Sequence, residues 1–238
     1  MKKTTPRLYC LAHPKSTNAE RFRSIRTNIR YSRVGGEIRS VLVTSSLPGE
    51  GKSTIAANLA AAMAENGRRV LLLDGDLRTP AVHEVFDLPN GSGLTSILVE
   101  QARWQDCIYP IQELEGLHVL TSGPISPNPA ELLGSTGMKE LFAELHNHWD
   151  TIVIDASSVL MPFSDALTLA RMAEGVLLVV RSGKVLQKHA ATAKQLLERN
   201  GARLLGAVLN RRSGRRRRYA IGSEELADWV TASGPRKG

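Results

Sequence analysis

The sequence predicts an α/β fold in which a mostly parallel β-sheet carries helices on both faces. Short aliphatic runs alternate along the chain with longer segments of helical character, and these runs are continuously apolar, as in strands buried on both faces. With 238 residues, the chain has the length of one ordinary α/β domain. We expect an extended N-terminal arm over 1–17, a globular domain over 18–210 and an arginine-rich tail with a short helix over 211–238.

The periodicity of apolar residues places the elements. A first helix over 18–31 has Phe22, Ile25 and Ile29 at helical spacing, begins at Asn18 as N-cap and ends near Gly35. Residues 81–117 are less periodic, apart from a short helix over 94–99. The other expected elements are a strand from 41, helix 55–63, strand 69–74, strand 117–120, helix 130–148, strand 151–155, helix 164–172, strand 175–181, helix 186–200, strand 203–209 and helix 223–229. Repeated β-α order predicts right-handed crossovers.

The formal net charge of +8 is local rather than general. Eight of the 31 basic residues belong to the tail, and the other 23 are matched by the 23 acidic residues of the whole chain. These eight are Arg211, Arg212, Arg215, Arg216, Arg217, Arg218, Arg236 and Lys237. Such a run is most often a solvated segment, with an anionic membrane face or an acidic partner as the next interpretation. Nucleic acid is not expected as a partner.

Cysteine content and hydropathy bear on the compartment. Cys10 and Cys107 are far apart and have no metal-binding spacing, which favours free thiols in a reducing compartment. The longest aliphatic runs, such as 176–180, are far too short to span a bilayer. The sequence therefore predicts a cytoplasmic protein.

A phosphate-binding loop lies between the strand that begins at 41 and the helix over 55–63. Its residues are Pro48, Gly49, Glu50, Gly51, Lys52, Ser53 and Thr54. In such a loop the backbone N–H groups cradle phosphate, Lys52 reaches the β- and γ-phosphate oxygens, and the Ser53 hydroxyl ligates Mg²⁺. Ser46 occupies the position where the usual pattern begins with glycine, so the match covers the spacing and the Gly-Lys-Ser end. The loop predicts nucleotide binding.

Three carboxylates follow strands whose carboxyl ends should lie beside this loop. Asp74 and Asp76 come at the end of strand 69–74, and Asp155 ends strand 151–155. Ligands of open parallel sheets bind beyond the carboxyl ends of the strands, which favours metal and base chemistry for these residues. The alternative for Asp74 is that it caps the following turn.

Five motifs in this order resemble the bacterial tyrosine kinases (BY-kinases), P-loop enzymes that regulate capsular and exopolysaccharide synthesis. The motifs are Glu20-x-x-Arg23-x-x-Arg26-Thr27-Asn28, Pro48-Gly49-Glu50-Gly51-Lys52-Ser53-Thr54, Leu73-Asp74-Gly75-Asp76-Leu77-Arg78-Thr79-Pro80, Gly123-Pro124-Ile125-Ser126-Pro127-Asn128-Pro129-Ala130-Glu131-Leu132-Leu133 and Gly175-Val176-Leu177-Leu178-Val179-Val180-Arg181. The resemblance implies a P-loop NTPase fold and a protein-tyrosine kinase that uses ATP and Mg²⁺. It implies Asp76 and Asp155 as metal ligands, Asp74 as base and Asn210 near the adenine.

The resemblance also implies partners. A helix bearing Glu20, Arg23 and Arg26 mediates self-association into a ring in the family, and we expect these side chains to remain outside their own domain. A membrane-bound activator, the polysaccharide co-polymerase, is implied as a second partner that recruits the kinase to the inner face of the membrane. Protein tyrosines, mostly on a neighbouring copy, are the implied substrates.

Two departures from the family pattern affect the expected activity. Ala156-Ser157-Ser158 follows Asp155 where the family has Thr-Pro-Pro, and the family's C-terminal tyrosine cluster is missing. We expect Tyr219 to be the phosphoacceptor, with the neighbouring arginines making its modification a charge switch; the alternative is that the arginines form a docking patch. The remaining tyrosines are Tyr9, Tyr31 and Tyr109.

Two other functions compete with the kinase. The missing tyrosines favour a catalytically weak regulatory ATP-binding module of the co-polymerase. A positional ATPase of the MinD/ParA type shares the fold, but it carries an additional lysine where this chain has Leu47.

Overall fold

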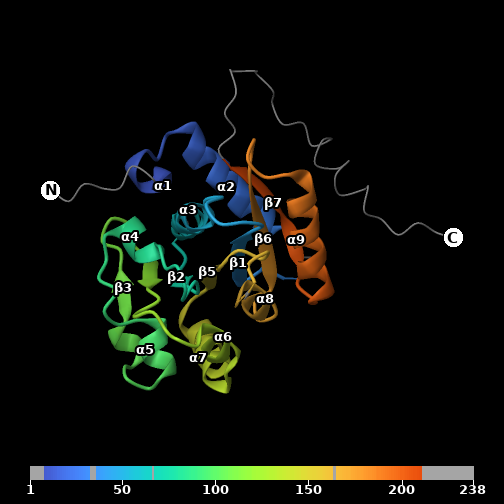
Figure 1. Cartoon of the computed structure of the whole chain (residues 1–238). Helices are drawn as coiled ribbons and strands as arrows, with labels where there is room; N and C mark the ends of the chain where they lie inside the picture. Colours follow the sequence, from blue (N-terminus) through green and yellow to red (C-terminus); the bar gives the residue numbers. More distant parts are fainter. Residues whose placement is uncertain (1–7, 33–35, 66, 163–164, 211–238) are drawn as a thin grey trace.

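The structure, a computed structural model, describes residues 8–32, 36–65, 67–162 and 165–210 (Figure 1). Tyr219, the arginine run and the short helix expected over 223–229 lie outside these residues. In the described part of the chain, no helix has both the length and the apolar character needed to cross a membrane.

The described chain is built on a sheet of seven strands. Their spatial order is β3 (Ile108–Pro110), β4 (Leu117–Leu120), β2 (Val70–Asp74), β5 (Thr151–Asp155), β1 (Ser40–Ser45), β6 (Gly175–Arg181) and β7 (Leu204–Asn210). Only the pairing of β3 with β4 is antiparallel, so the predicted mostly parallel sheet is confirmed. The register sets Asp155 beside Asp74 on one side and Val43 on the other, which brings three carboxyl ends together.

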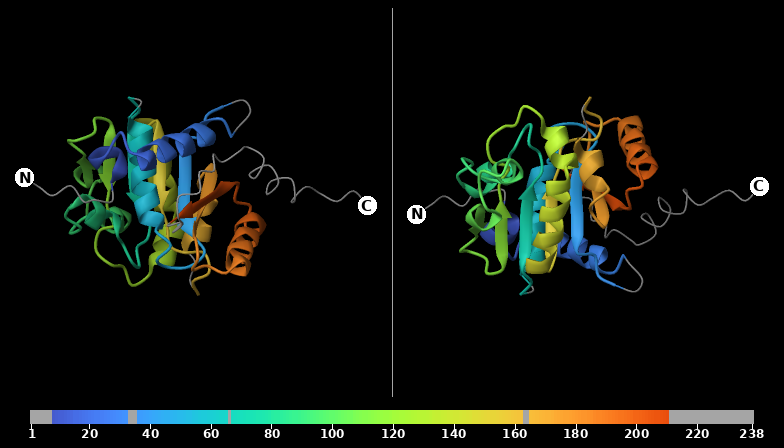
Figure 2. Two further views of the ribbon diagram at one scale, coloured as in Figure 1. Left: turned by 90° about the horizontal axis from the view of Figure 1, so that it is seen from above. Right: turned by 90° about the horizontal axis from the view of Figure 1, so that it is seen from below.

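Helices cover both faces of the sheet, as predicted (Figure 2). One layer contains α1 (Tyr9–Ala12), α2 (Thr17–Arg30), α3 (Lys52–Ala64) and α4 (Val82–Phe86). The other contains α5 (Leu94–Leu98), the 3₁₀ helix η1 (Trp104–Asp106), α6 (Pro129–Gly134), α7 (Thr136–His148), α8 (Asp165–Ala170) and α9 (Gln187–Arg199). Val41 and Val43 of β1 face the first layer and Leu42 faces the second. Because both faces are covered, the central strands β1, β2 and β5 are buried along their whole length.

Helix α3 is buried because it lies between the sheet and α2. Every residue from Ile55 to Ala64 is buried, which explains the alanine-rich composition, since small side chains allow close approach from both sides. Phe22 and Ile29 of α2 pack into this layer. The helix that follows the phosphate loop is therefore fixed along its whole length.

The described part of the N-terminal segment differs from the expected extended arm. It contains α1, whose Cys10 is buried and whose Tyr9 N–H donates to Asn58 Oδ1 of α3 at 2.7 Å. Burial raises the pKa of the Cys10 thiol to about 11. Helix α2 begins at Thr17, and its N-cap is Ser16 rather than Asn18, because Ser16 Oγ accepts the Ala19 N–H at 3.2 Å.

Two further differences lie in the middle of the chain. The single helix expected over 130–148 is divided into α6 and α7 by Ser135, whose extended backbone interrupts the helix and whose Oγ accepts the Met138 N–H at 3.1 Å. The weakly periodic segment 81–117 contains α4 and the antiparallel strand β3, which the sequence did not predict. The short helix expected over 94–99 is confirmed as α5.

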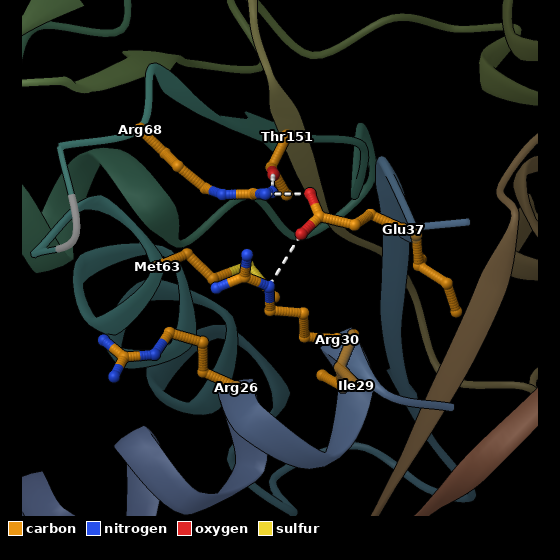
Figure 3. Close-up of a pocket in the computed structure, with 8 residues that line it drawn as sticks. Arg26, Ile29, Arg30, Glu37, Met63, Arg68 and Thr151 are labelled. Carbon is orange, nitrogen blue, oxygen red and sulfur yellow. Dashed lines mark hydrogen bonds and ion pairs between the residues drawn. The ribbon is translucent and has the colours of Figure 1, made fainter. Parts of the chain in front are cut away.

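The amino ends of the parallel strands carry a network of ion pairs (Figure 3). Arg30 Nε donates to Glu37 Oε1 at 2.6 Å, Arg68 contacts the other oxygen of Glu37, and Arg69 pairs with Asp150 at 3.4 Å. A cavity of about 30 Å³ is lined by Arg26, Ile29, Arg30, Glu37, Ile38, Met63, Arg68 and Thr151. A groove of about 480 Å³ is lined by Glu37, Arg39, Arg68 and Asp150. Both lie at the end of the sheet opposite the phosphate loop.

Candidate active site

The phosphate loop connects β1 to α3 at the carboxyl end of the sheet. Gly49 and Gly51 have φ angles of 78° and 96°, a left-handed conformation that side chains with a Cβ rarely adopt. Gly51 is the N-cap of α3, so the helix begins at Lys52, followed by Ser53 and Thr54 in its first turn. Its free N–H groups and its dipole therefore favour an anion at the loop. The expected loop residues thus lie together, with Pro48 and Gly49 exposed.

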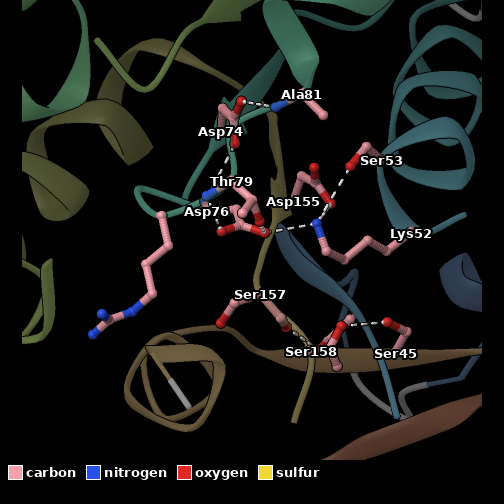
Figure 4. Close-up of polar contacts among 12 residues, drawn as sticks. Ser45, Lys52, Ser53, Asp74, Asp76, Thr79, Ala81, Asp155, Ser157 and Ser158 are labelled. Atoms are coloured by element: carbon pink, nitrogen blue, oxygen red, sulfur yellow. Dashed lines mark hydrogen bonds and ion pairs between the residues drawn. The ribbon is translucent and has the colours of Figure 1, made fainter. Parts of the chain in front are cut away.

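The ammonium group of Lys52 lies among the predicted carboxylates (Figure 4). Its Nζ is 2.8 Å from Asp76 Oδ2 and 3.9 Å from Asp155 Oδ1, and it donates to Ser53 Oγ at 3.4 Å. Burial lowers the pKa of Lys52, but the charges of Asp155 and Asp76 outweigh burial and raise it. Four predicted residues from three separate segments are therefore confirmed as neighbours.

Asp155 is the most unusual of these groups. It is fully buried, and neither carboxylate oxygen has a hydrogen-bond partner of normal geometry among the described residues. Burial raises the pKa of Asp155 to about 6, against the opposing effects of the Lys52 charge and the Ser53 hydroxyl. A buried carboxylate whose oxygens lack hydrogen-bond partners, with its nearest cation 3.9 Å away, is costly for the fold, which points to a ligand at this position.

These donors fit Mg²⁺. Magnesium prefers oxygen ligands and is usually held by one or two carboxylates together with substrate phosphates. Asp155, Asp76 and the Ser53 hydroxyl supply such oxygens beside the phosphate loop. Across the described ranges, no three or more His, Cys, Asp or Glu side chains gather in a metal-binding arrangement. Phosphate oxygens would therefore complete the coordination.

Asp74 is held by backbone N–H groups. Its Oδ1 accepts from Asp76 at 3.2 Å, and its Oδ2 accepts from Ala81 at 3.2 Å and from Val82 at 3.0 Å. Burial and the Asp155 charge raise the pKa of Asp74, and the Val82 N–H opposes them. The capping role that the sequence left open is thus present, because Asp74 ties the end of β2 to the start of α4.

Asp76 is held by Thr79 as well as by Lys52. The backbone N–H of Thr79 donates to Asp76 Oδ1 at 3.0 Å, and its hydroxyl donates to Oδ2 at 3.1 Å. The next basic residue, Arg78, forms a two-pronged ion pair with Asp165 at the start of α8, at 2.7 and 3.3 Å. The segment after β2 is therefore fixed at both its acidic and its basic side chains.

The Ala156-Ser157-Ser158 segment runs beside the last residues of β1. Thr44 Oγ1 donates to the Ser157 carbonyl at 2.6 Å, and the hydroxyls of Ser158 and Ser45 are 3.0 Å apart. Hydrogen bonds therefore fix this segment where the family pattern has prolines. The Ser157 hydroxyl differs, because it is buried without a hydrogen-bond partner among the described residues.

Asn210 lies against the phosphate loop itself. Its Nδ2 donates to the Glu50 carbonyl at 2.8 Å, and a Cβ added to Gly51 would lie 2.3 Å from that nitrogen. Glu50 is buried, and burial raises the pKa of its carboxyl while the N–H groups of Leu47 and Arg181 lower it. The structure thus gives Asn210 a contact with the loop, and a contact with adenine stays a prediction.

We had expected Glu20, Arg23 and Arg26 of α2 to remain outside their own domain. This expectation is wrong for the two arginines, which contact other residues of the same chain. Arg23 donates to both carboxylate oxygens of Glu65 just after α3, at 2.7 Å each, and also pairs with Glu20. Arg26 donates to the Ala62 carbonyl at 2.6 Å and lies 3.7 Å from Glu65. The reason is that α2 packs on α3, which brings Glu65 within reach. Of Glu20, Arg23 and Arg26, only Glu20 is largely exposed.

Sequence reasoning missed the partners that several motif residues contact across the fold. Arg78 with Asp165, Arg23 with Glu65, and Glu50 with Arg181 each join segments far apart in the chain. Their motifs were visible, but only the fold supplies the partner. Tyr219 lies outside the described residues, so the structure does not test its assignment.

Comparisons with known proteins place the chain among its relatives. The family model of the CobQ/CobB/MinD/ParA nucleotide binding domain matches residues 41–233. Tyrosine-protein kinase YwqD of Bacillus subtilis is 46% identical over 200 residues, which cover 84% of this chain and 84% of YwqD. The solved structure of the chimerical protein CapA2B2 superposes with a TM-score of 0.84 and 40% identity, covering 88% of this chain and 92% of that one.

A nucleotide is present in a more distant relative. The septum site-determining protein MinD of Pyrococcus horikoshii, solved in complex with Mg-ADP, has a TM-score of 0.64 and 28% identity, covering 80% of this chain and 76% of that one. The phosphate loop, the acidic strand ends and these relatives support one assignment. The chain belongs to the tyrosine-protein kinases of bacterial capsule and exopolysaccharide synthesis and contains their nucleotide-binding P-loop domain.

Proposed function

We propose that this chain transfers the γ-phosphoryl group of Mg·ATP to protein tyrosines, mostly on a neighbouring copy. The observation that carries the proposal is the buried group of Lys52, Asp76 and Asp155 beside the phosphate loop, in which neither Asp155 oxygen has a hydrogen-bond partner among the described residues. Such a group is costly for folding alone, and phosphoryl transfer uses it directly.

In the proposed step, a bond forms between the tyrosine oxygen and the γ-phosphorus as the bond to ADP breaks. Catalysis depends mainly on positioning and charge, since the negative charge of the transition state is spread over the transferring oxygens. The loop N–H groups and the Lys52 ammonium would hold these oxygens. Mg²⁺, held by Ser53, Asp76 and Asp155, would supply further charge neutralisation when bound.

The tyrosine proton needs an acceptor, and Asp74 is the proposed base. A tyrosine hydroxyl has an ordinary pKa near 10, so a carboxylate beside it must take the proton as the new bond forms. Asp74 Oδ2 accepts two backbone N–H groups but Oδ1 accepts one, so Oδ1 keeps a lone pair for the tyrosine proton. Asp74→Asn tests the role: loss of kcat at unchanged ADP affinity supports a base, whereas loss of fold supports capping alone.

Self-association is proposed through α2 and its Glu20, Arg23 and Arg26. The second proposed partner is a membrane-bound polysaccharide co-polymerase, which would hold this cytoplasmic chain at the inner face of the membrane. The similarity to the CapA2B2 chimera supports such an activator. Charge pairs across such contacts tune specificity more than affinity.

The proposed phosphoacceptor is Tyr219, because the chain offers few alternatives. Among the described tyrosines, Tyr9 and Tyr109 are half-buried and only Tyr31 is largely exposed, at 76%. A phosphate of about −1.5 to −2 charge on Tyr219 would pair with the adjacent arginines and reduce their field. Mass spectrometry of wild type, Tyr219→Phe and Tyr31→Phe after incubation with Mg·ATP identifies the acceptor.

The deciding experiment is incubation of the purified chain with Mg·ATP, alone and with a co-polymerase segment, followed by phosphotyrosine detection. Phosphotyrosine in either reaction supports the kinase. Nucleotide binding without phosphotyrosine in either reaction would instead favour the regulatory ATP-binding module, which the small number of tyrosines also favours.

A further inference from the structure

Glu50 is a carboxylate inside a loop that binds phosphate. It is 2% exposed, and its two oxygens accept backbone N–H groups from two different parts of the chain. Oε1 accepts from Leu47 within the loop at 2.5 Å, and Oε2 accepts from Arg181 at the end of β6 at 3.0 Å. The Glu50 side chain therefore links Leu47 and Glu50, the two ends of the loop's turn, and attaches them to β6 of the sheet.

Two further contacts attach the same loop to the neighbouring strand ends. Asn210, the last residue of β7, donates from Nδ2 to the Glu50 carbonyl at 2.8 Å. The Arg181 side chain donates to the Gly49 carbonyl at 3.2 Å. The loop between Leu47 and Gly51 is therefore held from β6 and β7, whereas Lys52 and the carboxylates lie on the side of β2 and β5.

We propose that Glu50 is a positioning residue that sets the phosphate loop in its anion-binding conformation by anchoring it to the end of β6. The proposal rests on the proposed function, since it concerns the same nucleotide site. A carboxylate suits the task because it offers an acceptor on both oxygens to two N–H donors. Glutamine has the same shape but offers one acceptor, and its NH₂ group would face a donor.

The charge of Glu50 makes the proposal testable, because two explanations predict opposite changes in nucleotide affinity when that charge is removed. A negative charge near bound phosphate opposes binding, so its removal at constant shape should strengthen nucleotide affinity if electrostatics alone matter. If Glu50 instead positions the loop, Glu50→Gln breaks one of two charge-assisted hydrogen bonds and weakens affinity. The two views predict opposite directions.

The experiment measures ADP affinity by calorimetry, with and without Mg²⁺, for wild type, Glu50→Gln, Glu50→Asp and the exposed control Glu140→Gln. We expect Glu50→Gln to raise the Kd for ADP by about tenfold, Glu50→Asp to restore part of the loss, and Glu140→Gln to match wild type. Thermal unfolding without nucleotide checks that each variant folds. Equal or tighter ADP binding by folded Glu50→Gln overturns the proposal.

A second variant covers the case in which Glu50→Gln does not fold. Asn210→Ala removes the contact from β7 and leaves the loop's own hydrogen bonds, so we expect a smaller rise in Kd; pyrophosphate is the ligand for this variant, because Asn210 is also the predicted adenine contact. If Asn210→Ala and Glu50→Asp both have the same binding affinity as wild type, the proposed anchoring role of Glu50 is wrong. Failure of wild type itself to bind ADP counts against the proposed function and is therefore distinguishable from failure of the anchor.

Discussion

The two ends of the parallel sheet both gather charged residues, but in opposite ways. At the carboxyl end, the side chains of Lys52, Asp76 and Asp155 are only 12%, 2% and 0% exposed. At the amino end, Arg68 and Glu37 pair while their side chains remain 28% and 40% exposed. The carboxyl end therefore buries charged side chains that are incompletely paired, whereas the amino end has paired charged side chains at the surface.

This difference separates a functional site from structural pairing. Surface ion pairs contribute about 0–1 kcal/mol each and need no ligand to explain them. Buried carboxylates that lack partners cost stability, and proteins retain that cost where function requires it. The cavity of about 30 Å³ and the groove of about 480 Å³ both lie among the paired residues of the amino end, and Lys52, Asp76 and Asp155 line neither of them.

The largest expected effect is the loss of phosphotyrosine formation in Lys52→Met. The substitution removes the cation that would hold the transferring oxygens, and oxygen-stabilising groups of this kind typically contribute about 10²–10³ in kcat. Phosphotyrosine after incubation with Mg·ATP and the activator is the measurement. Arg68→Met at the amino end is the matched control, and we expect it to retain most activity. Equal loss in both variants would remove the distinction between the two ends.

The next effect concerns the arginines of α2. Reversing both Arg23 and Arg26 to Glu should give monomers, because the charges proposed to meet a neighbouring copy are inverted. It should also destabilise the fold, since Arg23 pairs with Glu65 within the chain. Light scattering reports the mass and thermal unfolding reports the fold.

A charge swap separates these two roles. Arg23→Glu combined with Glu65→Arg restores an opposite-charge pair within one chain, so we expect the stability of the fold to recover while association stays lost. If association returns together with stability, Arg23 acts only inside its own chain and the proposed interface is wrong.

The third effect tests the cost of buried charge at the carboxyl end. Asp155→Asn removes a carboxylate whose pKa is raised to about 6 by burial, so the ionised form is less stable in the folded chain than in the unfolded chain. We expect the free energy of unfolding to rise in EDTA, while the Mg²⁺-dependence of ADP binding is lost.

Asp150→Asn is the control at the amino end. The Arg69 N–H lowers the pKa of the exposed Asp150, so its ionised form favours the fold, and the substitution should reduce stability slightly. Thermal and urea unfolding in EDTA measure both variants. A less stable Asp155→Asn would contradict the comparison of the two ends.

The sequence predicted the carboxyl end better than the amino end for a physical reason. Asp74, Asp76 and Asp155 follow continuous apolar strands, so a parallel sheet places them together without any knowledge of packing. The alternation of strands and helices likewise predicted the layers. Strand β3 was missed because it is short and half-buried, and α1 because a single helical turn has little periodicity.

Contacts that depend on tertiary packing could not be predicted. Glu65 receives Arg23 only because α2 lies on α3, and Glu50 reaches the Arg181 N–H only because β6 neighbours β1. The expectation that Arg23 and Arg26 remain outside failed for this reason, since helical spacing gives a face and not the neighbour of that face.

The smallest expected effect applies the same comparison to two adjacent serines. The hydroxyls of Ser158 and Ser45 are 3.0 Å apart in the interior, whereas the Ser157 hydroxyl is buried without a partner among the described residues. Removing one member of a buried pair costs about 1 kcal/mol, so Ser158→Ala should lower the free energy of unfolding by that amount.

Removing an unpartnered hydroxyl relieves a desolvation cost, so Ser157→Ala should leave stability unchanged or raise it. Ser157→Ala should instead change the Kd for ADP, because Ser157 follows Asp155 by two residues and its buried hydroxyl has no hydrogen-bond partner among the described residues. Urea unfolding together with the Kd for ADP distinguishes the two serines, and a loss of stability in Ser157→Ala equal to that in Ser158→Ala would show that an unpartnered buried group does not mark function at this end of the sheet.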